Sequence, residues 1–240
     1  MSVFAQHVPG RALSCDLFCA LEATDLDALV NNLQASSDPN SFDMFLGMPL
    51  HNAVRVGWVE GIEALLAAGA DPYANDGTGT AIAAAAAFDQ VQALLTLADS
   101  GANLAAADDA GQTPLHAAAS NGATNAIQVL VAQGASLEAR MITRGEMPLH
   151  VAAREGQLSA VALLIELGAD TATRDLNYEQ TALHFAVRSG SLAVVHYLVQ
   201  AGTPLDAVND NGATALDLAY SNGNTNVVQY LESVGAKSAR

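Results

Sequence analysis

The chain has 240 residues, 51% of them hydrophobic but only 5% aromatic, so its interior must be built from small side chains that approach closely. Nine Lys and Arg residues stand against 25 Asp and Glu residues, and the resulting formal net charge of −16 argues against a nucleic acid as partner. The longest apolar run, Ala81–Phe88, is far shorter than the ~20 residues of a membrane-spanning helix, so we expect no membrane segment.

Residues 1–11 are interpreted as an N-terminal tail without a secretion signal, because Pro9 and Gly10 interrupt the apolar stretch that such a signal needs. The only two cysteines, Cys15 and Cys19, match neither a redox pair nor a zinc site on their predicted helix. We interpret them as reduced, partly buried thiols. Reduced thiols and the missing signal together predict a cytoplasmic protein.

From residue 48 onward, two short motifs recur in register at intervals of 32 to 34 residues. The first has Pro or Ala followed by Leu or Ile, and its six copies begin at Met48, Thr80, Thr113, Met147, Thr181 and Thr214. The second follows 21 residues later each time and begins at Gly69, Gly101, Gly134, Gly168, Gly202 and Gly235. Because this offset is constant, differences in length are confined to the connecting loops.

Each copy has the local signals of two helices. In the third copy, the hydroxyl of Thr113 can cap a helix, and Pro114 takes the first helical position, where a missing N–H costs nothing. Ala118 is small enough for successive helices to pack closely, and Gly122 supplies the left-handed backbone that ends the helix. Apolar residues at helical spacing then predict a second helix that ends at Gly134. The unit is therefore helix, turn, helix and loop.

The period of about 33 residues and the sequence T-P-L-H resemble the ankyrin-repeat family. The resemblance implies an all-α solenoid of stacked helix-turn-helix units with hairpin-like loops, about seven repeats in all. The first unit is a degenerate N-terminal capping repeat over residues 12–42, and six repeats cover residues 43–240. Their predicted ranges are 43–75, 76–107, 108–140, 141–174, 175–209 and 210–240.

Several positions depart from the repeat pattern. The second full repeat has Asp89 where its neighbours have the turn glycine, and its loop is one residue shorter. Met48 and Met147 stand at the capping position and should each forgo ~1 kcal/mol of capping. Polar residues such as Asn222 and Glu232 replace apolar or small ones in the last repeat, as expected of a unit that ends a solenoid.

Four histidines share one position in the repeat and raise the question of a metal ladder; they are His51, His116, His150 and His184. The resemblance implies instead that each one hydrogen-bonds the backbone of the neighbouring loop, which we prefer over metal ligation. Carboxylates such as Asp108 and Asp109 come without a nucleophile or a second ligand at catalytic spacing. We therefore predict no enzyme, no catalytic residue, no cofactor and no metal.

The resemblance also implies that a partner protein binds the concave face, which loop tips and inner helices form. Carried over position by position, the candidate partner-binding residues are Met44, Phe45, Arg55, Phe88, Arg144, Arg154, Tyr178 and Arg188. Residues 1–140 hold 3 basic and 15 acidic residues, whereas residues 141–240 hold 6 and 10. Arginine and tyrosine are enriched at interface hot spots, so the fourth and fifth full repeats are the predicted recognition patch. The alternative is that these arginines only make the surface soluble.

We therefore expect a monomeric, non-enzymatic interaction module that binds another protein. Two further interpretations stay open. The acidic N-terminal half could mask a basic surface of an enzyme, which would make the chain a regulatory or inhibitory protein. The chain could also be an effector delivered to another cell, which would leave few traces in a sequence without a leader.

Overall fold

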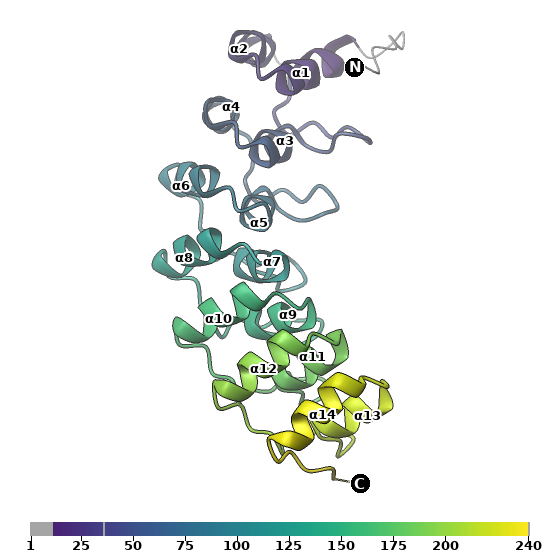
Figure 1. The fold of residues 1–240 in the computed structure, drawn as a ribbon. Helices are drawn as coiled ribbons and strands as arrows, with labels where there is room; N and C mark the ends of the chain where they lie inside the picture. The colour runs from purple at the N-terminus through teal and green to yellow at the C-terminus, as the bar shows by residue number, and fades with distance from the viewer. Residues whose placement is uncertain (1–11, 36, 240) are drawn as a thin grey trace.

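The structure is a computed structural model that describes residues 12–35 and 37–239; the predicted tail, residues 1–11, lies outside the described part. The described residues form fourteen helices and no strand. Two isolated β-bridges, Asp43 to Gly47 and Asn75 to Thr80, close two loop tips. The helices pair along the chain into about seven units, so the predicted all-α solenoid is confirmed (Figure 1).

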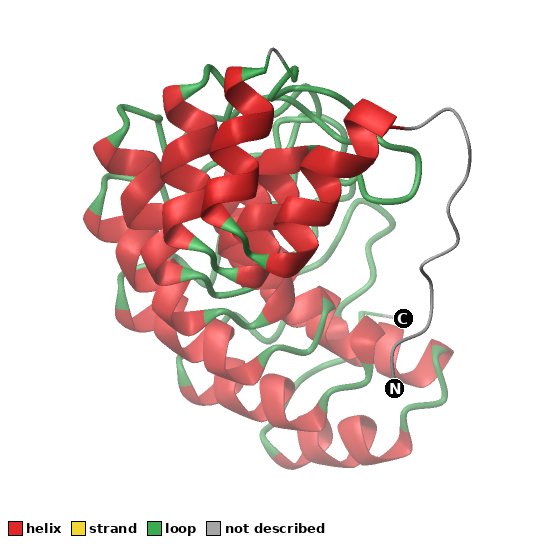
Figure 2. Ribbon diagram, turned by 90° about the horizontal axis from the view of Figure 1, so that it is seen from above, coloured by secondary structure: helices red, strands yellow, loops and turns green. Residues whose placement is uncertain are grey.

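The helices form two stacked rows (Figure 1). The inner row consists of α1 (Ala12–Ala23), α3 (Pro49–Val56), α5 (Ala81–Ala87), α7 (Pro114–Asn121), α9 (Pro148–Arg154), α11 (Ala182–Ser189) and α13 (Ala215–Ser221). The outer row consists of α2 (Leu26–Gln34), α4 (Val59–Ala67), α6 (Val91–Asp99), α8 (Thr124–Ala132), α10 (Leu158–Glu166), α12 (Leu192–Gln200) and α14 (Thr225–Ser233). The long loops project from the inner row, and Figure 2 shows the rows curving around them.

The core runs along the whole stack between the two rows. Ala118, Ala119 and Ala153 on the inner helices are completely buried, because a larger side chain would force neighbouring layers apart. The outer helices supply the larger buried side chains, such as Leu130 and Leu164. Successive inner helices therefore lie close together, and the residues at their C-terminal ends lie next to one another along one face.

The turns within the repeats have the left-handed backbone that the glycines predict. Gly122, Gly156 and Gly190 have φ values of 71°, 70° and 73°. Asp89, which replaces the glycine in the second full repeat, also lies in this region, at φ 56°. Its carboxylate accepts hydrogen bonds from the N–H of Ala126 (2.7 Å) and from Nδ2 of Asn125 (2.8 Å), in the first turn of the next outer helix. These contacts offset the strain of a non-glycine residue there.

The repeated histidines connect each repeat to the loop that follows it. Nε2 of His51 lies 2.9 Å from the carbonyl oxygen of Gly79, and Nε2 of His116 lies 3.2 Å from that of Glu146. Nε2 of His150 lies 3.1 Å from the carbonyl oxygen of Thr173, and Nε2 of His184 lies 3.2 Å from that of Ala213. In the last three, Nδ1 accepts the N–H of the residue before the helix, so the proton lies on Nε2. Burial lowers the pKa of His150 to about 4 and also lowers the pKa of His116 and His184. The histidines therefore act as hydrogen-bonding groups.

One expectation about the first repeat is wrong. Cys19 is exposed rather than partly buried, because it lies on the side of α1 opposite to the buried Leu17, Phe18 and Leu21. The side chain of Cys15 lies outside the described part. At the other end of the stack, Asn222 and Glu232 are exposed, as the polar substitutions in the last repeat predict.

Candidate functional site

A hollow lies on the loop side of the inner helices, between the fourth and fifth full repeats. It has a volume of about 500 Å³. Its lining comes from two loops and from the C-terminal ends of α9 and α11, and consists of Thr143, Arg144, Glu146, Arg154, Asn177, Tyr178, Phe185, Arg188 and Ser189. We call this hollow the arginine pocket. It brings together four of the eight candidate residues: Arg144, Arg154, Tyr178 and Arg188.

The two loops of the arginine pocket are each one residue longer than the loop of the third full repeat. In that repeat, the N–H of Asp108 donates to the carbonyl oxygen of Gln112, which closes a loop of five residues. The pocket loops close six, from Met141 to Glu146 and from Asp175 to Gln180, with N to O distances of 2.9 Å in both. The residues just before the left-handed position of these longer loops are Arg144 and Tyr178. Each of the two longer loops thus contributes one of these side chains to the pocket lining.

Hydrogen bonds between neighbouring loops fix the pocket walls. The amide nitrogen of Asn177 donates to the carbonyl oxygen of Thr143 (3.0 Å), and the N–H of Asp210 donates to that of Tyr178 (3.0 Å). A Cβ on Gly145 would lie 2.5 Å from the nitrogen of Leu176, so these two loops are in direct contact. The loop that carries Tyr178 is therefore tied to the loops on both sides.

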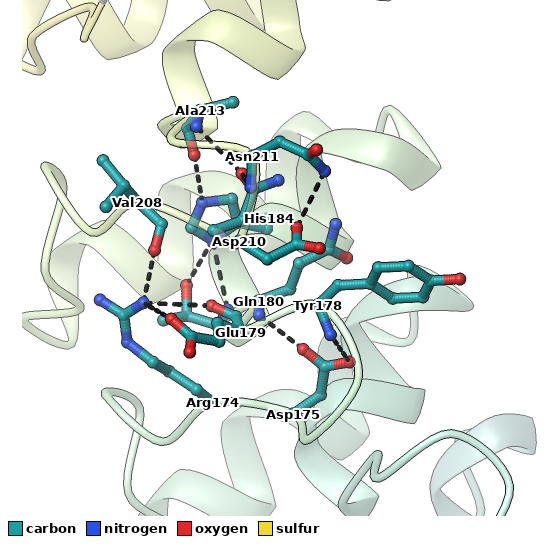
Figure 3. Close-up of polar contacts among 12 residues, drawn as sticks. Arg174, Asp175, Tyr178, Glu179, Gln180, His184, Val208, Asp210, Asn211 and Ala213 are labelled. Carbon is teal, nitrogen blue, oxygen red and sulfur yellow. Dashed lines mark hydrogen bonds and ion pairs between the residues drawn. The ribbon is translucent and has the colours of Figure 1, made fainter.

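Arg140 and Arg174, which precede the two pocket loops, bind loop carbonyl groups. Nη1 of Arg140 donates to the carbonyl oxygen of Arg174 (2.8 Å), and Arg174 makes the equivalent bond to Val208. Figure 3 shows the guanidinium of Arg174 directed at Val208 and Glu179, while the ring of Tyr178 points away from this network. Neither arginine lines the pocket. They hold successive loops together.

The three arginines of the pocket differ in how far their guanidinium groups are already paired. Arg154 forms ion pairs with Glu146 through Nη1 and with Glu155 through Nε, the latter at 2.9 Å. Arg188 has one contact at the limit of a hydrogen bond, 3.5 Å from Nη1 to Oε1 of Gln180. Arg144 is exposed and has no hydrogen bond or ion pair within the described residues. Two guanidinium groups therefore retain most of their donors.

Glu146 is the only carboxylate in the pocket lining. Its burial raises the pKa of this carboxyl, while Arg154 and Arg144 act to lower it. With three arginines and one glutamate, the lining carries a positive charge inside a strongly acidic chain. The pocket can therefore hold an anionic group.

The other four candidate residues lie outside the arginine pocket. Met44 and Phe45 are strongly exposed on the loop before α3, Arg55 is exposed on the last turn of α3, and Phe88 is exposed at the end of α5. Phe42, which is 59% exposed, belongs to the same part of the surface, and we did not single it out from the sequence. This N-terminal group is apolar apart from Arg55.

Two pocket residues also escaped the sequence analysis. Phe185 follows the T-A-L-H segment at a position where the corresponding residues are Ala117 and Val151, so its size was an available signal. Glu146 precedes the helix that carries Arg154 by two residues, and its pairing with that arginine depends on the loop conformation. No pattern in the sequence signals this contact.

Within residues 12–35 and 37–239, no group of three or more His, Cys, Asp or Glu side chains is placed to hold a metal ion. None of the helices in the same part of the chain has the length and apolar content required to cross a membrane.

Comparisons with known proteins agree with this architecture. A family model described as ankyrin repeats in three copies matches residues 104–175 and 149–238. Among solved structures, the ankyrin repeat domain of Bcl-3, described as a unique member of the IkappaB protein family, is 29% identical with a TM-score of 0.71. That match covers 89% of this chain and 97% of the other. A search of curated proteins finds no match. Because the family model covers more than half of the residues, this chain belongs to the ankyrin-repeat family.

Proposed function

We propose that the chain is a non-enzymatic module that binds a partner protein through its concave face and loop tips, as a cytoplasmic monomer. The observation that carries the proposal is the arginine pocket, which unites Arg144, Arg154, Tyr178 and Arg188 from two loops and two helices. Arginine and tyrosine are typical of interface hot spots, and ankyrin repeats typically bind proteins. The lining contains no Ser–His or Cys–His pair, so its chemistry is that of binding.

The four candidate residues of the first two full repeats support a second contact area. Met44, Phe45 and Phe88 are exposed apolar side chains of the first two full repeats. A partner that spans several repeats would cover both these residues and the arginine pocket. Met44, Phe45, Arg55 and Phe88 therefore remain in the proposal as contacts of lower energetic weight.

Charge reversal in the arginine pocket tests this function. The double variant Arg144→Glu with Arg188→Glu should lose at least about tenfold in affinity for the partner, because close interfacial charge pairs typically contribute more than 1.4 kcal/mol. Arg154 is left intact, since its loss would leave Glu146 buried without a counter-charge. The measurement is quantitative capture of the partner from a lysate of the source cells, then affinity for the purified partner and a melting curve for each variant.

Arg55→Glu is the matched control. Arg55 lies on the last turn of α3, at the same position of the repeat as Arg154, but it belongs to the first full repeat and lies outside the pocket. If Arg55→Glu weakens binding as much as the double variant, the effect comes from overall charge and the proposed site is wrong.

A regulatory or inhibitory function is the second candidate, and the net charge of −12 on residues 1–140 favours it. Under this proposal the N-terminal half masks a basic surface of an enzyme. Asp109 and Glu138 are suitable test positions because both are exposed and neither side chain holds a loop, whereas Asp43 and Asp76 accept loop N–H groups. Loss of binding in Asp109→Asn with Glu138→Gln, and not in the arginine double variant, would favour this candidate over the first.

A further inference from the structure

We infer that the arginine pocket receives the carboxylates of an acidic peptide segment of the partner, with Arg144 and Arg188 as its primary donors. The inference rests on the proposed function and names the chemistry of the ligand at the same site. Three guanidinium groups line one hollow of about 500 Å³, and a carboxylate is the group that pairs with two parallel N–H bonds of a guanidinium.

The donors that remain available decide where the ligand enters. Arg144 has no hydrogen bond or ion pair in the described part of the chain, and Arg188 has one contact at 3.5 Å. Two neutral donors of the lining are already engaged, because the amide of Asn177 binds the Thr143 carbonyl and the hydroxyl of Ser189 binds the Ala186 carbonyl. The charged donors that remain available are mainly those of Arg144 and Arg188.

Arg154 is pre-ordered between two carboxylates of the chain, and these two differ. The side chain of Glu146 is 6% exposed, so its ion pair with Arg154 belongs to the folded structure. The side chain of Glu155 is 42% exposed and binds Nε of Arg154 from the rim. Exposed ion pairs contribute little to stability, so a ligand carboxylate can replace Glu155 at small cost. Glu155 is thus the carboxylate that a ligand would displace from Nε of Arg154.

The apolar part of the lining fits the remainder of an acidic residue. The ring of Tyr178 points away from its loop network (Figure 3), and Phe185 on α11 is a second aromatic residue of the lining. The methylene groups of a Glu or Asp residue can pack on such rings while the carboxylate reaches the arginines. A free inorganic anion would gain nothing from these two rings.

The chain as a whole, with a net charge of −16, does not attract an acidic ligand, so the attraction must come from the pocket itself. Charges farther than about 8 Å are largely screened at physiological ionic strength, so the ligand experiences mainly the arginines and Glu146 at close range. Recognition should therefore depend on individual pocket residues and not on the total charge of the chain.

A peptide array tests the inference on the full chain. The immobilised peptides have random flanks and two adjacent fixed positions, occupied by Glu-Glu, Gln-Gln or phosphoserine-phosphoserine. We expect the Glu-Glu set to retain labelled protein at least about tenfold better than the Gln-Gln set, as charge-assisted hydrogen bonds allow. Arg144→Gln and Arg188→Gln should each remove most of this preference, while Lys237→Gln, which removes one exposed positive charge outside the pocket, should keep it.

Glu155→Gln gives a response that general charge attraction would not single out. It should strengthen binding of the Glu-Glu set about threefold to fivefold, because it removes the competing carboxylate and costs little stability. Glu166→Gln is the matched control, since Glu166 ends α10 in the outer row and makes the same change of total charge. An equal gain in both variants would overturn the proposed exchange at Arg154.

Three array results would overturn the inference: equal retention on the Glu-Glu and Gln-Gln sets, equal losses in Lys237→Gln and the pocket variants, or retention on the phosphoserine set alone. These outcomes are separable from failure of the proposed function. If the natural partner still requires Arg144 and Arg188 while the Glu-Glu set is not bound, the pocket binds a partner by other chemistry. In that case only the carboxylate assignment is wrong.

Discussion

The N-terminal and C-terminal parts of the solenoid use the same pair of helices but offer different surfaces. Through residue 140, the loops close over four or five residues, and the inner helices of the second and third full repeats end in alanine and asparagine. In the fourth and fifth repeats the loops close over six residues, and Arg154 and Arg188 stand at or next to the helix ends. The buried alanines are the same in both parts. The pair of helices is therefore constant. The fourth and fifth repeats differ from the second and third by an additional loop residue and by an arginine at or next to the end of the inner helix.

Acid should have the largest effect, and this effect should fall on the third, fourth and fifth full repeats, which contain His116, His150 and His184. His116, His150 and His184 all have a lowered pKa in the folded state, so the unfolded chain binds more protons as the pH falls below 6.5. Stability is then lost with falling pH, and the window for His150 runs from 6.5 to about 4. At 1.36 kcal/mol per pKa unit, His150 alone accounts for about 3 kcal/mol.

Urea unfolding at pH 7 and pH 5, with hydrogen exchange at both, measures this loss. We expect exchange at pH 5 to increase first in the repeats that contain α7 to α12. His150→Gln should reduce the pH dependence, and an unchanged slope in that variant would contradict the assignment of the buried neutral histidine.

Glu146 should show a smaller pH effect of the same origin but in the opposite direction. Its pKa is raised in the folded state, so the folded chain binds the extra proton and stability falls as the pH rises from 4.5 through the raised value. Glu146→Gln removes this decline, so the stability of the variant relative to the natural chain should grow between pH 4 and pH 6. A stability difference that stays constant from pH 4 to pH 6 would contradict the raised pKa of Glu146.

The capping methionines give the smallest and most local comparison. Nδ1 of His51 is buried and has no hydrogen-bond partner within the described residues, and the preceding Met48 is half-buried. Met48→Thr should place a hydroxyl near this nitrogen, as Thr113 does for His116 at 2.8 Å, and stabilise the chain by about 1 kcal/mol.

Met147→Thr is the matched variant in the C-terminal part. Met147 is 2% exposed and its N–H already binds Nδ1 of His150, so the loss of the buried thioether offsets the new hydroxyl bond. We expect a smaller gain than in Met48→Thr. Urea midpoints of the two variants decide, and an equal or larger gain in Met147→Thr would contradict this reasoning.

The sequence was sufficient for the architecture because each repeat carries its own helix starts, turn glycines and small packing residues. It also led to the four candidate residues that line the arginine pocket, since both longer loops and both helix-end arginines can be seen when the repeats are compared. The pairing of Arg154 with Glu146 was out of reach, because it depends on how a six-residue loop folds back over a helix. The loop contacts of Arg140 and Arg174 were in principle detectable, as the two arginines are 34 residues apart and occupy the same place in consecutive repeats.

The histidine hydrogen bonds have a consequence for synthesis of the chain on the ribosome. Each of the four donors reaches a carbonyl that lies between 23 and 30 residues further along the chain. A newly made repeat therefore holds a buried donor that stays without its acceptor until the loop that follows the repeat has been made. The growing end of the nascent solenoid is always the incomplete one, so repeats should become stable one after another behind it, in the order in which they are translated.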